Sequence, residues 1–285
     1  MVKFGIHALT WVSRWDKNSL DVIDKAKEFG FDLIEIPLLK PEDISLAKEI
    51  RGKLNSLKMS CAGSVGLPEL ANITSVDEEV RKTGIEFLKK CVISTAEMGG
   101  KILTGVTYTG FGKNPVRTAT EKEWNYSAEA LKQVARFARD YGITLGIEAV
   151  NRYETNLVNT ASQAKRLKKM VGEDNVGIHL DTYHMNIEEK GFSRPIKEIG
   201  KDLIYVHMSE SDRGIPGTGN VDWDEVFKAL SQIDYSGPLT TETFCSSIPG
   251  MVCASVWREL VPSQNIFAKE ALKFLNKKKN EYYVK

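Results

Sequence analysis

The sequence has little of what marks several large classes of protein. It contains four cysteines in 285 residues and no Cys-x-x-Cys pair, so a zinc knuckle or a thioredoxin-like motif is not supported. No stretch approaches the roughly 20 apolar residues that cross a bilayer. The first residues lack the charged start and apolar run of a secretory signal. We therefore expect a cytoplasmic protein with reduced thiols.

The sequence also lacks a surplus of charge of either sign. Lysine and arginine number 39 against 38 aspartates and glutamates, a formal net charge of +1. This balance gives no electrostatic basis for binding nucleic acid or an anionic membrane, so we expect neither partner. A Gly-x-Gly-x-x-Gly motif is missing after the first candidate strand, which disfavours a dinucleotide-binding fold.

What is present is a regular alternation of short apolar strands with amphipathic helical segments. Capping-box patterns precede three of these segments, at Ser75–Glu78, Thr120–Glu123 and Thr160–Gln163. Eight strand–helix units in a row predict an α/β fold, a single (β/α)8 TIM barrel in which residues 1–285 form one domain. The candidate strands are Lys3–Leu9, Phe31–Pro37, Met59–Val65, Lys101–Thr107, Thr144–Val150, Asn175–Asp181, Ile204–Glu210 and Pro238–Phe244.

The last four candidate strands each carry a metal-ligand side chain at or near their carboxyl end. These side chains belong to Glu148, Asp181, His207 and Glu242, separated by 33, 26 and 35 residues. Active sites of such barrels lie at the carboxyl ends of the strands, so the four should meet on one rim. A single carboxylate at a strand end is more often a helix cap or an ion-pair partner. Four in consecutive strands instead predict a site for a hard divalent cation such as Mn²⁺, Mg²⁺ or Co²⁺.

A second group of polar residues follows in the loops that leave these strands. Glu154, His184 and Arg213 could reach over a bound polyol, although each alone could be a solvated loop residue. His179 should lie one layer below Asp181, where a supporting role is favoured over metal ligation. His7 could line the pocket or pack in the core. Three aromatic residues of early loops have the same two interpretations: Trp11, Trp15 and Phe111.

Three segments resemble the D-tagatose 3-epimerase family, which includes D-psicose (D-allulose) 3-epimerases and L-ribulose 3-epimerases. The resemblance extends over essentially the whole chain. The fold that it implies is a xylose isomerase-like barrel. The segments are Gly-Ile-Glu148-Ala-Val-Asn-Arg-Tyr-Glu154, Leu-Asp181-Thr-Tyr-His184-Met-Asn-Ile-Glu-Glu and Val-His207-Met-Ser-Glu-Ser-Asp-Arg213-Gly.

The resemblance implies a metal-dependent isomerase, a ketose 3-epimerase. Such an enzyme interconverts C3 epimers through a cis-enediolate. Examples are D-fructose and D-psicose, D-tagatose and D-sorbose, and L-ribulose and L-xylulose. Glu148 and Glu242 match the family's acid/base pair and two of its metal ligands, while Asp181 and His207 match the other two. One Mn²⁺ per subunit is the expected cofactor, with Co²⁺ or Mg²⁺ as alternatives.

The same resemblance assigns the second group of residues to the substrate. Glu154, His184 and Arg213 match the residues that hold the O1–O2 end of the ketose. His7 is retained as a further candidate for substrate binding. A homodimer or homotetramer is the expected assembly.

Other functions remain open on the same sequence. An aldose–ketose isomerase on this barrel would use the same metal but move a proton between C1 and C2. A sugar-binding barrel without activity would bind but not convert, although the intact Glu148 and Glu242 argue against it. An abasic-site endonuclease of similar architecture needs many histidines for three zinc ions, and this chain has four.

Overall fold

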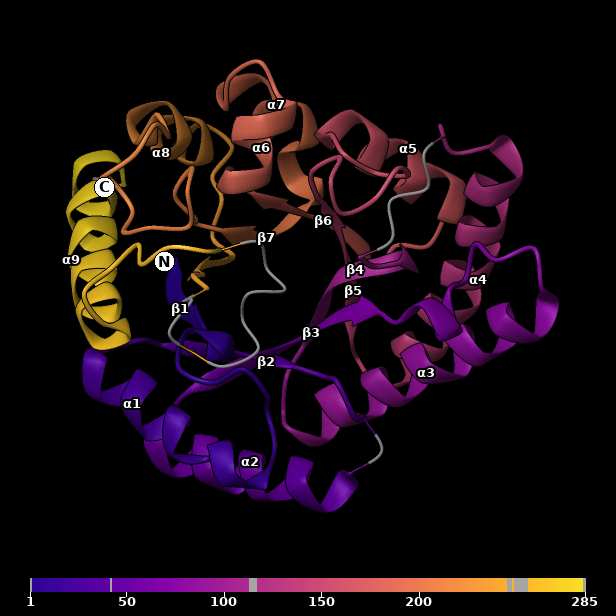
Figure 1. Ribbon diagram of the computed structural model, residues 1–285, viewed down its shortest axis with the longest axis horizontal. Helices are drawn as coiled ribbons and strands as arrows, with labels where there is room; N and C mark the ends of the chain where they lie inside the picture. Colours follow the sequence, from indigo (N-terminus) through magenta and orange to yellow (C-terminus); the bar gives the residue numbers. More distant parts are fainter. Residues whose placement is uncertain (1, 42, 113–116, 245–247, 249–255, 284–285) are drawn as a thin grey trace.

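Eight parallel strands form a closed barrel in the computed structural model of the protein, shown end-on in Figure 1. The structure describes residues 2–41, 43–112, 117–244, 248 and 256–283. Each strand pairs in parallel with the next one along the chain, and β8 closes the barrel against β1. The predicted (β/α)8 barrel is therefore confirmed. The strands are β1 (Lys3–His7), β2 (Leu33–Pro37), β3 (Ser60–Leu67), β4 (Ile102–Gly110), β5 (Thr144–Ala149), β6 (Val176–Asp181), β7 (Leu203–His207) and β8 (Pro238–Thr241).

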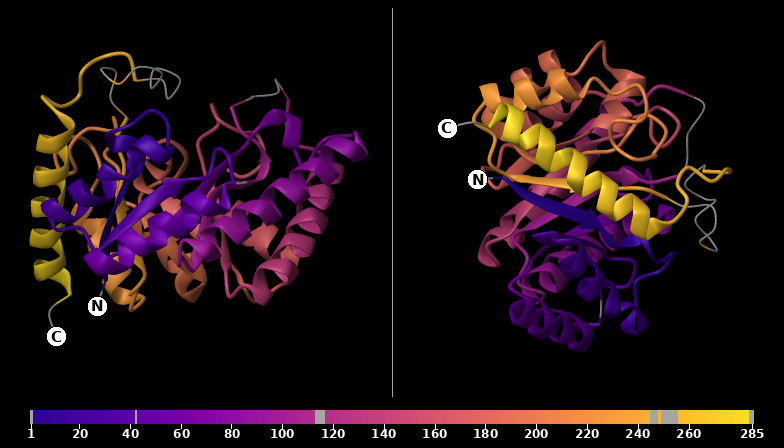
Figure 2. Two further views of the ribbon diagram at one scale, coloured as in Figure 1. Left: turned by 90° about the horizontal axis from the view of Figure 1, so that it is seen from below. Right: turned by 90° about the vertical axis from the view of Figure 1, so that its left-hand side faces the viewer.

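Helices surround this barrel, and α9 closes the ring between α8 and α1 (Figure 1). The side view shows the loops after the strands gathered at one end, whereas β1 starts and α9 ends at the other (Figure 2). Among the described residues, no helix combines the length and the apolar content needed to span a membrane. The helices are α1 (Asp21–Phe29), α2 (Ile44–Leu57), α3 (Glu78–Glu97), α4 (Glu121–Asp140), α5 (Ala161–Val171), α6 (Thr182–Glu188), α7 (Ser193–Ile199), α8 (Trp223–Gln232) and α9 (Gln264–Tyr282).

The helix starts follow local capping chemistry. The capping boxes that begin at Thr120 and Thr160 are present as expected. The expected box at Ser75 is wrong, because α3 begins after Asp77, whose carboxylate accepts the Glu79 N–H at 2.9 Å. Ser75 instead accepts the backbone N–H of Asp77 at 3.1 Å. Aspartate directly before the helix is a strong N-cap, so it sets the start of the helix.

Three strands end two or three residues earlier than their apolar patterns suggested. β1 stops at His7, because the His7 Nδ1 accepts the Leu9 N–H at 3.1 Å and starts a short 3₁₀ helix, η1 (Ala8–Thr10). β7 stops at His207, and β8 stops at Thr241, one residue before Glu242. The candidate site residues thus stand where the backbone leaves the barrel.

The barrel interior beneath these strand ends is filled by side chains. Leu33, Ala62 and Tyr205 form a buried cluster there. His179 lies against Tyr205 with ring centroids 5.0 Å apart, and it lies against His207 at 4.2 Å. This packed floor closes the barrel below the site, as is usual in barrels of this type. Of the four cysteines, Cys61 and Cys91 are buried, and Cys245 and Cys253 lie outside the described residues.

Candidate active site

The four predicted ligand residues meet at the carboxyl ends of β5 to β8. The Nδ1 atom of His207 lies 3.4 Å from Glu148 Oε1, 3.6 Å from Asp181 Oδ2 and 3.6 Å from Glu242 Oε2. All four side chains are buried. The structure therefore brings together the four side chains that the strand-end pattern selected.

This arrangement fits a metal ion. The buried Nδ1 of His207 has no hydrogen-bond partner among the described residues, although three carboxylates face it. Donor atoms of Asp181, His207 and Glu242 lie within 4.8 Å of one another. A buried imidazole nitrogen without a partner is costly, and coordination of a cation would satisfy it together with the carboxylates. Three oxygen-bearing ligands and one nitrogen suit a hard or borderline divalent ion.

The clustering of charge shifts the pKa values of these groups. Burial raises the pKa of Glu148 to about 7, and the neighbouring carboxylates of Asp181 and Glu242 act in the same direction against His207. Burial also opposes ionisation of Asp181, but the guanidinium of Arg213 holds the pKa of Asp181 well below its usual range. Burial would lower the pKa of His207, yet the surrounding carboxylates raise it well above its usual value.

Arg213 reaches into the site from the loop after β7. Its Nη1 donates to Asp181 Oδ2 at 2.7 Å, to Glu242 Oε2 at 2.7 Å and to Ser209 Oγ at 2.9 Å. The backbone of Arg213 is left-handed, with φ of 66°. A non-glycine residue in this region is strained, and such strain often accompanies a functional position. The loop thus holds the guanidinium over two of the candidate ligands.

Glu154 and His184 are joined by a residue that the sequence did not single out, Asn151. The backbone N–H of Asn151 donates to His184 Nδ1 at 3.1 Å, and its side-chain amide donates to Glu154 Oε1 at 2.8 Å. Burial lowers the pKa of His184 to about 3, so the ring is neutral at pH 7. Because Nδ1 accepts, the proton is on Nε2, which lies 3.8 Å from Asp181 Oδ2. Burial raises the pKa of Glu154 to about 7.

His7 and His179 occupy different levels of the site. The Nε2 of His7 lies 3.9 Å from Glu242 Oε1 and 3.2 Å from Ser64 Oγ, so His7 borders the ligand cluster. His179 lies one layer below, where its Nδ1 contacts Thr104 Oγ1 at 2.9 Å. His7 thus lies beside the candidate ligand cluster, and His179 lies beneath it.

A second residue absent from the sequence-based set is Glu35 on β2. It is completely buried, and its Oε2 lies 2.7 Å from His207 Nε2. A single acidic residue in an apolar strand carries no motif. The available signal was an acidic residue in the middle of the apolar run Leu-Ile-Glu-Ile-Pro, because a charge buried in such a strand requires a partner.

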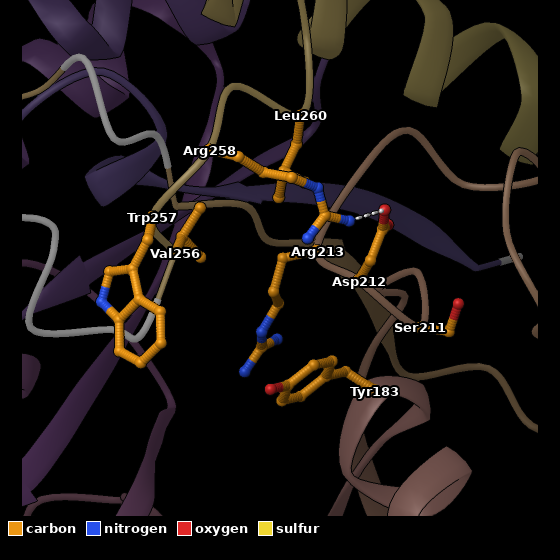
Figure 3. Close-up of a pocket in the computed structure, with 8 residues that line it drawn as sticks. All are labelled: Tyr183, Ser211, Asp212, Arg213, Val256, Trp257, Arg258 and Leu260. Carbon is orange, nitrogen blue, oxygen red and sulfur yellow. Dashed lines mark hydrogen bonds and ion pairs between the residues drawn. The ribbon is translucent and has the colours of Figure 1, made fainter.

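A pocket of about 400 Å³ opens next to Arg213 (Figure 3). Tyr183 stacks on the guanidinium, 4.1 Å from ring centroid to Cζ, and Trp257, a residue that is 80 % exposed, lies on the opposite side of the pocket. Trp11 instead stacks on Phe29 and donates its Nε1–H to Asn265, and Trp15 is buried in the core. Phe111 is 43 % exposed.

This fold and site define an α/β barrel of the xylose isomerase-like type. The model of the xylose isomerase-like TIM barrel family matches residues 23–278. The chain is 38 % identical to an L-ribulose 3-epimerase of Methylomonas sp. (strain DH-1), over 97 % of this chain and 98 % of that protein. It is 40 % identical to a ketose 3-epimerase of Arthrobacter globiformis, over 91 % and 90 %.

Solved structures agree with these relatives. A D-allulose 3-epimerase from Methylomonas sp., in complex with D-allulose, superposes with a TM-score of 0.92 at 38 % identity. The match covers 97 % of each chain. The chain belongs to the ketose 3-epimerase family, whose members are isomerases.

Proposed function

We propose that this protein is a metal-dependent ketose 3-epimerase that acts on free ketopentoses and ketohexoses. The observation that carries the proposal is the buried Nδ1 of His207, which has no hydrogen-bond partner within the described part of the chain and faces three carboxylates in a barrel of this family. Glu148, Asp181, His207 and Glu242 would hold one divalent cation, with Mn²⁺ first and Co²⁺ or Mg²⁺ as alternatives. When bound, the cation supplies Lewis acidity that stabilises negative charge on the carbonyl and hydroxyl oxygens of a ketose.

Glu148 and Glu242 are the proposed acid/base pair. They come from β5 and from the end of β8, three strands apart around the barrel, so their carboxylates approach the site from different sides. One removes the C3 proton, the electrons pass to the C2 carbonyl oxygen to give a cis-enediolate, and the other returns a proton to the opposite face of C3. Inversion requires two such groups, and one carboxylate alone would return the proton to the face from which it came.

We propose that Arg213 and its neighbours bind the reacting end of the sugar. Arg213 offers fixed donors, His184 offers its Nε2–H, and Glu154 offers a carboxylate oxygen. Together they can bind vicinal hydroxyl groups, as a polyol requires. We propose His7 as a contact on the other side of Glu242.

The candidate substrates are epimer pairs of the kinds that the relatives' names suggest. They are L-ribulose and L-xylulose, D-fructose and D-psicose, and D-tagatose and D-sorbose. The pocket lined by Tyr183 and Trp257 also includes Arg213, and its shape would limit which ketoses can bind. We further propose one domain, a homodimer or homotetramer, and a cytoplasmic location. Sedimentation analysis tests the assembly.

The decisive experiment follows single ketoses in D₂O with chelated protein, before and after addition of Mn²⁺, Co²⁺ or Mg²⁺. The proposal requires no turnover after chelation, recovery with a divalent ion, and deuterium at C3 of both epimers. Deuterium at C1 or C2 and none at C3 would indicate an aldose–ketose isomerase instead. Binding of ketoses without exchange at any carbon, with metal present, would indicate a sugar-binding barrel.

A further inference from the structure

Glu35 is a buried charge that the proposed proton transfer does not use. It lies in the middle of β2, in the run Leu-Ile-Glu-Ile-Pro, and its side chain points into the barrel with no solvent exposure. Removing a carboxylate from water costs several kcal/mol unless strong partners replace the water. The contacts of Glu35 therefore indicate its role.

Two imidazole rings face this carboxylate. Glu35 Oε2 lies 2.7 Å from Nε2 of His207, and Glu35 Oε1 lies 3.4 Å from Nε2 of His7. His7 Nδ1 already accepts the Leu9 N–H, so the proton of a neutral His7 is on Nε2, on the side of Glu35. The shorter contact, to His207, spans the barrel interior and joins residues 172 positions apart in the chain.

This contact determines which nitrogen of His207 is free. An ionised carboxylate can only accept a hydrogen bond, so a separation of 2.7 Å places a proton on Nε2 of His207. In the neutral ring, the Nδ1 atom then has a lone pair, and that lone pair faces Glu148, Asp181 and Glu242. The opposite tautomer would direct an N–H at the metal position and a lone pair at Glu35. Neither contact would then be favourable.

We propose that Glu35 is a positioning residue of the metal site, which keeps the His207 proton on Nε2 and the Nδ1 lone pair aimed at the ion. The inference rests on the proposed function, because it presumes a cation among the four ligands. Carboxylates that orient a ligating histidine in this way contribute about 10- to 100-fold to metal affinity. Glu35 would act on binding of the ion through His207, without touching the substrate.

The test compares Mn²⁺ affinity in wild type, Glu35→Met and Glu35→Gln, with free Mn²⁺ followed by electron paramagnetic resonance. We expect Glu35→Met to bind Mn²⁺ about 10- to 100-fold more weakly. We expect Glu35→Gln to recover much of that loss, because its amide oxygen still accepts the Nε2–H. Thr104→Val is the matched control, since it removes a buried partner of the neighbouring imidazole of His179. It should leave Mn²⁺ affinity unchanged.

The tautomer of His207 is measured separately by ¹⁵N nuclear magnetic resonance of the imidazoles, in metal-free and Mg²⁺-loaded protein. The chain has four histidines, so their signals can be assigned by single substitutions. In the Mg²⁺-loaded protein, a proton on Nδ1 of wild-type His207 would overturn the inference, even if Glu35→Met does not fold. So would a folded Glu35→Met with wild-type Mn²⁺ affinity. Failure of the wild type to bind any divalent ion would instead overturn the proposed function.

Discussion

Replacing either proposed acid/base residue with glutamine should stop epimerisation while preserving the size of the side chain. Glu148 Oε1 and Glu242 Oε2 lie 3.4 and 3.6 Å from the same nitrogen of His207, so both carboxylates border the proposed metal position. An amide neither takes up nor delivers the C3 proton. Losing a general acid/base costs about 10²- to 10⁴-fold in rate, which corresponds to about 3–5 kcal/mol of barrier. The weaker ligand adds a loss of metal affinity, which saturating Mn²⁺ should offset.

The two variants should differ in the exchange of the C3 proton that each still catalyses. With one carboxylate left, a substrate whose C3 proton faces it can still exchange that proton with solvent, but the proton returns to the same face. We therefore expect Glu148→Gln and Glu242→Gln each to incorporate deuterium at C3 of one epimer only, without inversion, and each to favour the opposite epimer. Asp181→Asn serves as the control, because it weakens the metal site without removing a proton-transfer group.

The assay is proton nuclear magnetic resonance of each pure epimer in D₂O at saturating Mn²⁺. It separates C3 exchange from formation of the other epimer in one time course. Epimerisation by either glutamine variant at more than about a tenth of the wild-type rate would refute its role, since a general base contributes at least about 10²-fold. Identical one-sided exchange in both variants would refute the assignment of opposite faces.

Two further predictions concern the charges around this pair. Arg213→Met should lower the free energy of unfolding of chelated protein by about 3–5 kcal/mol, because the carboxylates of Asp181 and Glu242 lose their buried partner. Urea unfolding measures this loss, which should be smaller with Mn²⁺ bound. A loss below about 1 kcal/mol in chelated protein would contradict the reasoning. Glu154→Gln should stabilise chelated protein at pH 8 but not at pH 4.5. The folded-state pKa of Glu154, about 7, exceeds its ordinary value of 4.5, so ionisation opposes folding increasingly as pH rises between them, by about 3 kcal/mol at most; a pH-independent difference would exclude this cause.

The strand order was predictable because each strand is a short apolar run bounded by helix caps. What the pattern did not predict was where strands stop. Apolar or β-branched residues still occur after His207 and Thr241, at Met208, Thr243 and Phe244, so the alternation of residue types did not mark the strand ends. The same holds at His7, where an imidazole rather than a serine or aspartate caps the following turn.

The clustering of the four candidate ligands could be predicted from strand ends because a barrel returns every strand to the same rim. Glu35 could not, since its partner His207 is 172 residues away and a lone acidic residue has no periodic signature. Asn151 was hidden for another reason: it acts through its backbone N–H as well as its side chain, and backbone donors leave no trace in residue identity. The left-handed turn at Arg213 is likewise set by the loop rather than by residue type.

The buried carboxylates of the candidate site require more positive charge than Arg213 alone provides. Glu148, Asp181, Glu154 and Glu242 converge within the same buried volume, and Arg213 is one positive charge among them. Arg213 holds the pKa of Asp181 low, whereas burial raises the pKa values of Glu148 and Glu154 to about 7. A divalent ion bound by folded protein would supply the missing charge. It would also stabilise the fold in proportion to its concentration over its dissociation constant. Metal binding and folding stability would therefore be coupled through the same carboxylates that we propose as the acid/base pair.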